Sequence, residues 1–68
     1  MTRYKKKKKI IKKFFHQRQT TQMSYKDIAV ITGVKPHEIG EIVGNLRDDG
    51  LLFIEKNHGK SSRYHYIN

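Results

Sequence analysis

The first hydrophobic stripe of the chain consists of two apolar pairs, Ile10-Ile11 and Phe14-Phe15, that stand four residues apart. This spacing puts the pairs on one face of a helix and turns the polar residues between them away from it. We predict a helix from about residue 5 to residue 19, anchored by Ile11, Phe14 and Phe15. Its first turns are expected to fray, because the five adjacent lysines there repel one another.

A second helix is predicted from about Tyr25 to Thr32, with a cap at each end. Ser24 is placed to cap the N-terminus, and Asp27 stands three residues on, as in a capping box. Gly33 can take the left-handed backbone conformation that commonly ends a helix. Residues 20–22 break the helical pattern before this segment and are assigned no element.

The third stripe follows a tight turn in which Val34 is expected to be buried. Pro36 suits the first position of a helix, where its missing N–H costs nothing. The apolar residues after it have the spacing of an amphipathic helix and are Ile39, Ile42, Val43 and Leu46. We predict a helix that ends near Asp49 and is capped by Gly50.

After Gly50 the composition changes to that of strands. Residues 51–56 are rich in strand formers, residues 57–62 are rich in turn formers, and residues 63–67 alternate. The two runs predict a β-hairpin with a loop longer than two residues. The expected fold class is therefore mostly α with a small β-hairpin.

Three helices followed by a hairpin resemble the winged-helix family, the winged helix-turn-helix proteins. The residues at helix-turn-helix spacing are Ala29, Gly33, Val34, Ile39 and Ile42. The resemblance covers about residues 10–67 and implies a single winged-helix domain over 1–68, with a lysine-rich N-terminal segment over 1–9. The family includes transcription regulators, replication and mobile-element accessory proteins, single-strand binders and protein-docking modules.

The left-handed-duplex binders within that family use Asn and Tyr in the third helix and an aromatic residue in a proline-rich wing. This chain has Gly40, Gly44 and Ser61-Ser62 at the corresponding stretch. Their function is therefore not carried over to this chain.

The net charge of +9 is concentrated in the first segment of the chain. Residues 1–19 hold nine lysines and arginines and no acid, whereas residues 20–68 hold six basic and six acidic side chains. A segment of such one-signed charge indicates a polyanionic partner. The alternative is a lysine run that only solvates the chain.

The third helix, in contrast, carries two basic and four acidic side chains between Lys35 and Asp49. Coulomb repulsion opposes the entry of such a face into a DNA groove. Lys35 and His37, near the helix start, are its predicted base-edge contacts. Gly40 and Gly44 lie four residues apart and predict close approach, either by protein or by nucleic acid.

The predicted nucleic-acid contacts come from the N-terminal segment, the start of the third helix and the hairpin. They are Arg3, Lys5, Lys6, Lys7, Lys8, Lys9, Lys12, Lys13, Lys35, His37, Lys56, Asn57, His58, Lys60, Ser61, Arg63 and Tyr64. Most are phosphate-compatible donors. Tyr64 shares a strand face with Tyr66 and suits base stacking. The alternative is that both tyrosines cover a thin core.

Enzyme chemistry is not expected. The four histidines lack metal-motif spacing, cysteine is absent, and no glycine-rich phosphate loop is present. We expect no cofactor, no metal and no small-molecule substrate. No apolar run is long enough to span a bilayer or to form a signal peptide, so a cytoplasmic location is expected.

The leading interpretation is a DNA-binding winged helix that contacts phosphates through its basic N-terminal helix and wing. It would act as a small transcription regulator or as an accessory protein of replication or of a mobile element. The alternatives are a single-stranded DNA binder, a protein-docking module that uses the Gly40/Gly44 face, and a helix that lies on anionic lipid. A homodimer remains open as a partner.

Overall fold

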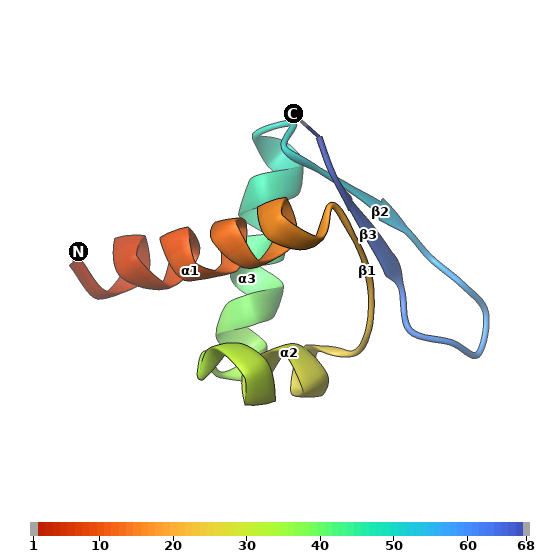
Figure 1. Ribbon diagram of the computed structural model, residues 1–68, viewed down its shortest axis with the longest axis horizontal. Coiled ribbons are helices and arrows are strands. Elements are labelled where there is room, and N and C mark those ends of the chain that lie inside the picture. Colours follow the sequence, from red (N-terminus) through yellow and green to blue (C-terminus); the bar gives the residue numbers. More distant parts are fainter. Residues whose placement is uncertain (1, 68) are drawn as a thin grey trace.

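The computed structural model describes residues 2–67, with side chains from residue 4 onward. The chain forms three helices and a small antiparallel sheet, and the first strand of the sheet lies between the first two helices, as Figure 1 shows. Their bounds are α1 (Thr2–Arg18), β1 (Thr20–Gln22), α2 (Tyr25–Thr32), α3 (Pro36–Asp48), β2 (Leu52–Glu55) and β3 (Arg63–Tyr66). Three helices were predicted and are confirmed, whereas the sheet has one strand more than the predicted hairpin.

Helix α1 begins at Thr2, three residues before the predicted start, and its lysine run is helical. The expectation of frayed first turns is therefore wrong for this structure. The reason lies in contacts with α3, across which α1 lies in Figure 1. Tyr4 and Lys7 each make a side-chain bond to α3, and Lys8 bonds to Asp49, the residue that caps the C-terminus of α3. These bonds tie the first two turns down and oppose the repulsion among the lysines.

Both caps predicted for α2 are confirmed. The Ser24 hydroxyl accepts a hydrogen bond from the Asp27 backbone N–H at 3.3 Å. Gly33 ends the helix with φ +77°, in the left-handed region that favours glycine. Pro36 stands at the start of α3, directly after Lys35, whose side chain makes no capping hydrogen bond. These caps and the short turn between them fix α2 against α3.

The sheet has the strand order β1-β3-β2, and both strand pairs are antiparallel. Strand β1 was not predicted, because three residues are too few for an alternation to stand out. The chain enters β1 through Gln19, whose φ of +63° is rare for a side chain other than glycine. This reversal brings β1 back along β3, where Thr21 pairs with Tyr64.

The core lies between the helices and one face of the sheet. Its buried side chains are Ile11, Phe14, Phe15, Ile28, Val34, Ile39, Ile42, Val43, Leu46, Leu52 and Tyr64. All four apolar positions predicted for α3 are among them. Ile10 departs from the predicted stripe, because its side chain is 40% exposed while that of its neighbour Ile11 is buried. Over residues 2–67, no helix is long and apolar enough to cross a membrane.

Candidate nucleic-acid interface

The lysines of α1 divide into two groups that the sequence does not distinguish. Five are on the outer side of the helix, which we call the α1 basic face, and these are Lys5, Lys6, Lys9, Lys12 and Lys13. Within residues 2–67, none of the five forms an ion pair. The predicted contact from Arg3 belongs to a side chain outside the described ones. The α1 basic face is therefore a strip of five uncompensated charges.

Lys7 and Lys8 turn toward α3 instead. The Lys7 Nζ donates to Glu38 Oε2 at 2.5 Å, and the Lys8 Nζ donates to Asp49 Oδ2 at 3.2 Å. The hydrogen bond from Lys7 lowers the pKa of the Glu38 carboxyl from its ordinary value of 4.5. Each bond offsets one lysine charge, so these two residues are poorer phosphate ligands than the sequence suggested.

Ion pairs account for most of the acidic side chains on and just after α3. Besides Glu38 and Asp49, Asp48 pairs with Arg47 at 3.5 Å, so three of the four acids in this region are in ion pairs. Among the described residues, Glu41 is the acid of this region that forms no ion pair, and it is exposed. Two of the acids therefore serve to hold α1, a role that sequence reasoning missed.

The two glycines of α3 differ in their surroundings. A Cβ added at Gly40 would lie 3.3 Å from Cε2 of Tyr25, so this glycine admits a ring of α2. A Cβ at Gly44 would meet nothing within 4 Å outside its own helix and chain neighbours. The predicted close approach by protein is thus confirmed at Gly40, and the contact comes from α2. Gly44 has no such contact.

Lys35 and His37, the predicted base-edge contacts, are both exposed at the start of α3. Asn45, farther along the helix, already has a partner within the protein, because its amide nitrogen donates a hydrogen bond to the Tyr4 hydroxyl of α1. The Tyr4 side chain is half-buried and packs against the hydrophobic core. Of the three α3 side chains considered for base contact, Lys35 and His37 are thus the exposed ones.

The loop between β2 and β3 carries the second basic surface. Lys56, His58 and Lys60 are exposed, and Asn57 is half-buried. Gly59 has φ +67°, which lets the chain reverse within this loop. We call residues 56–60 the wing tip.

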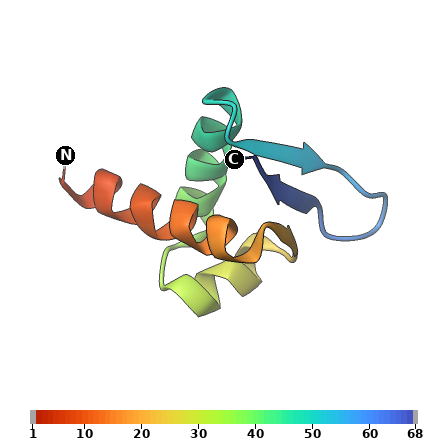
Figure 2. The same cartoon turned by 45° about the horizontal axis from the view of Figure 1, so that its top comes forward.

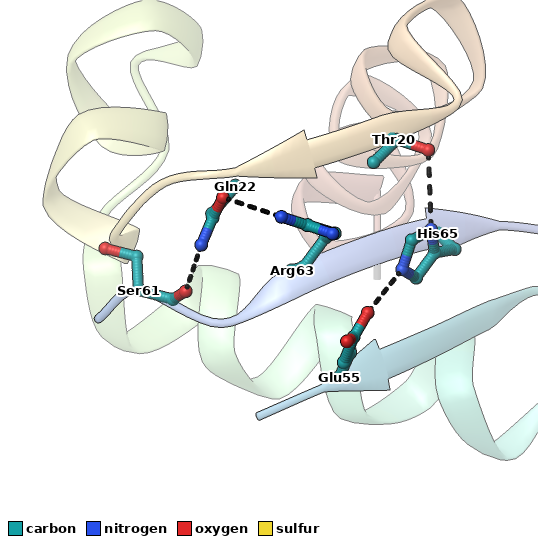
Figure 3. Close-up of polar contacts among 6 residues, drawn as sticks. All are labelled: Thr20, Gln22, Glu55, Ser61, Arg63 and His65. Carbon is teal, nitrogen blue, oxygen red and sulfur yellow. Dashed lines mark hydrogen bonds and ion pairs between the residues drawn. The ribbon is translucent and has the colours of Figure 1, made fainter. Parts of the chain in front are cut away.

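Side chains on the outer face of the sheet bond to one another, as Figure 3 shows. Arg63 Nη2 donates to Gln22 Oε1 at 3.3 Å, and Gln22 Nε2 donates to the backbone oxygen of Ser61 at 3.2 Å. Arg63 and Ser61, both predicted contacts, are therefore part of an internal network and are half-buried. The network joins β1 to β3 through Arg63 and to the end of the loop before β3 through Ser61.

Tyr64 is withdrawn as a contact, because its side chain is only 5% exposed. Its ring packs against Phe15, with centroids 5.5 Å apart, and stacks on Tyr25 at 6.2 Å. Burial, together with the neighbouring Tyr25 hydroxyl, raises the pKa of the Tyr64 phenol far above its ordinary value. The core role, which the sequence left open for both strand tyrosines, is the one that Tyr64 has.

His16 and Tyr66 adjoin the α1 basic face. The sequence did not point to His16, whereas Tyr66 was considered for base stacking together with Tyr64 but was not among the predicted contacts. The rings of His16 and Tyr66 meet edge to face, with centroids 5.1 Å apart and planes at 80°. Together with Lys9, Lys12 and Lys13 they line an open hollow between α1 and β3. The spacing of residues 9, 12, 13 and 16 was the available signal, since it puts all four on one helix face.

The α1 basic face and the wing tip lie toward opposite ends of the molecule. In Figures 1 and 2 the N-terminal turns of α1 project to one side and the loop after β2 projects to the other. The longest extent of the molecule is 35 Å. A ligand that reaches from the first turns of α1 to the wing tip must therefore span most of this length.

The described residues contain no group of three or more histidines, cysteines and acids that could hold a metal ion. Comparisons with models of protein families, with curated proteins and with solved structures found no match. The functional interpretation therefore depends on the geometry and charge of the chain itself.

Proposed function

We propose that this protein is a non-enzymatic DNA-binding winged helix that holds phosphates through the α1 basic face and the wing tip. The observation that carries the proposal is the division of the α1 lysines. The two that face inward are paired with acids of α3, whereas the five that face outward form no ion pair among the described residues. Unpaired lysines on one helix face suit a ligand with regularly spaced negative charges.

The winged-helix assignment rests on the order and caps of the elements. Helices α2 and α3 are joined by a turn that begins at Gly33, and a hairpin follows α3. In such a domain the second helix of the pair usually reads the major groove. Here Glu41 and Asp48 stand on the outer side of α3 and disfavour that use. Base contacts are proposed only for Lys35 and His37.

The size of the molecule sets the footprint. An extent of 35 Å matches one turn of duplex DNA, which is about 34–36 Å or 10 base pairs. A duplex of one turn that lies along the longest axis is therefore long enough to span from the first turns of α1 to the wing tip. The proposed role is a small transcription regulator or an accessory protein of replication or of a mobile element.

Fluorescence anisotropy with labelled DNA tests the proposal. A duplex of about 12 base pairs and the matching single strand are titrated at about 50 and 200 mM salt. Five lysines of α1 plus Lys56 and Lys60 make seven candidate phosphate contacts. The slope of log K against log salt for the duplex should then be about −6, because each contact contributes roughly −0.9.

Such a slope means a loss of affinity of about 10³–10⁴-fold between the two salt concentrations. A slope near −1 would mean that the protein contacts only about one phosphate, which would contradict the proposal. The absence of binding to either DNA at the lower salt concentration would refute DNA binding altogether.

A further inference from the structure

The hollow between α1 and β3 combines positive charge with an aromatic ring. Its lining consists of the three lysines Lys9, Lys12 and Lys13 together with His16 and Tyr66. Its volume of about 370 Å³ falls within the range of small-molecule sites. Within residues 2–67, no carboxylate pairs with any of the three lysines. The charge at this hollow is therefore available to a ligand.

The backbone holds Tyr66 in place beside this charge. Its N–H donates to the Gln19 carbonyl at 2.7 Å, which joins the end of β3 to the reversal after α1. His16 contacts the Tyr66 ring from the α1 side. The tyrosine is partly buried and still lines the hollow, so its ring is positioned before any ligand arrives.

The chemistry of the hollow selects a ligand with two parts. Lysine stems are apolar and their ammonium groups lie at the tips, so the lysines offer apolar walls and a cationic rim. A flat apolar ring with a phosphate beside it matches both. In duplex DNA the bases are stacked inside the helix, whereas in a single strand their faces are free to stack on aromatic side chains.

We propose that this hollow is a nucleotide subsite that binds one unpaired nucleotide, with its base on Tyr66 and its phosphates at Lys9, Lys12 and Lys13. The inference rests on the proposed function and names its ligand more narrowly as single-stranded nucleic acid, or an unpaired nucleotide beside a duplex. Duplex DNA uses the same lysines through its phosphates but leaves the tyrosine ring untouched.

Tyrosine fluorescence reports this contact directly, because the chain has four tyrosines and no tryptophan. The full chain is titrated with a single-stranded thymidine oligonucleotide, an abasic strand of equal length and a duplex. The thymidine strand should quench the emission of Tyr66, because a base stacks on its ring. The abasic strand has no base to stack and should leave the emission unchanged. Anisotropy measures the affinity for each labelled strand in parallel.

Two substitutions distinguish the effect of the aromatic face of Tyr66 from the effect of its apolar volume. Tyr66→Phe keeps the aromatic face, so affinity for the thymidine strand stays the same while the quenching disappears. Tyr66→Leu keeps apolar bulk against the core but removes the aromatic face, and we expect about a tenfold loss for that strand. Neither change alters duplex affinity.

The matched control is Phe53→Leu. Phe53 is 57% exposed and pairs with His65 on the outer face of the sheet, away from the hollow. This variant should bind both strand types as the unchanged protein does, and circular dichroism verifies that every variant is folded.

The subsite would be overturned if the thymidine strand did not quench the unchanged protein and bound Tyr66→Leu with the same affinity. Binding to the duplex in that case would still support the proposed function. If neither strand type bound at low salt, both proposals would fall. An equal loss for thymidine and abasic strands would also overturn the subsite, since it would show that Tyr66 acts without a base.

Discussion

Two adjacent pairs of lysines on α1 are expected to differ in their contribution to DNA binding. Lys5→Gln/Lys6→Gln and Lys7→Gln/Lys8→Gln each lower the net charge of +9 by two and change the same helix. Lys5 and Lys6 are exposed, whereas Lys7 and Lys8 are bonded to acids of α3. The comparison therefore holds charge and position nearly constant and varies only the pairing.

The expected magnitude follows from counterion release. Each phosphate contact contributes about −0.9 to the slope of log K against log salt, so loss of Lys5 and Lys6 should weaken the slope by about 1.8. Loss of Lys7 and Lys8 should change the slope by clearly less, because their ammonium groups face α3. That second variant should instead lose thermal stability, since it breaks the bonds to Glu38 and Asp49 and leaves only the Tyr4–Asn45 bond among the three described side-chain links at this contact.

Anisotropy titrations of one duplex at four or more salt concentrations measure the slopes, and thermal denaturation followed by circular dichroism measures stability. The slope is the deciding quantity, because affinity at a single salt concentration also responds to the carboxylates that Lys7→Gln/Lys8→Gln uncovers. Equal changes of slope for the two variants would show that the ion pairs of Lys7 and Lys8 do not reduce their contact with DNA. It would mean that the α1 lysines act as one diffuse charge, without the division that the ion pairs create.

Three further predictions concern the fold. Gly44→Ala should stabilise the protein by about 1 kcal/mol and raise Tm by about 4–8 °C, because an added Cβ would meet nothing within 4 Å outside its own helix and chain neighbours. Gly40→Ala should stabilise the protein less or destabilise it, because the added Cβ would lie 3.3 Å from the Tyr25 ring. A larger rise of Tm for Gly40→Ala than for Gly44→Ala would contradict this prediction. Thr21→Val should stabilise by about 1 kcal/mol, because the buried Thr21 hydroxyl has no hydrogen-bond partner among the described residues; a lower Tm would reveal a partner. Since the pKa of Glu38 is lowered in the folded state, its stabilising effect is complete above its ordinary value of 4.5 and is lost as pH falls through the lowered value. The Tm difference between the unchanged protein and Glu38→Gln should therefore shrink below about pH 4.5, and a constant difference would exclude the bond from Lys7.

Much of the helical architecture was predictable, because each helix carries local signals. The apolar spacing of α3, with Ile39, Ile42 and Val43, corresponds to its buried face. Ser24 and Gly33 mark the ends of α2 through hydrogen-bonding and backbone preferences that depend on neighbouring residues alone. Local rules suffice where the physical cause is local.

The parts that sequence reasoning missed depend on contacts between distant residues. Strand β1 is defined by its pairing with β3, more than forty residues along the chain, as in Thr20 with His65. The bonds from Lys7 to Glu38 and from Lys8 to Asp49 likewise span distant positions. No periodicity identifies such partners.

The candidate site shows the same division. Charge counts located the basic segment, and helical geometry separates its inner lysines from its outer ones once the position of α3 is known. Tyr64 and Tyr66 have the same residue type and strand face, so burial of one and access to the hollow by the other follow only from the packing of α1 against the sheet.

In the proposed binding mode, DNA contacts the α1 basic face and the wing tip and leaves the outer side of α3 untouched. Amide chemical-shift changes on titration of a short duplex test this mode most directly, because a chain of 68 residues gives separate signals for nearly every position. We expect the largest changes along Lys5–Lys13 and residues 56–60, with Glu41, Gly44 and Asp48 nearly unchanged. Changes concentrated at Glu41, Gly44 and Asp48, with α1 silent, would contradict this mode and make α3 the reader of the groove.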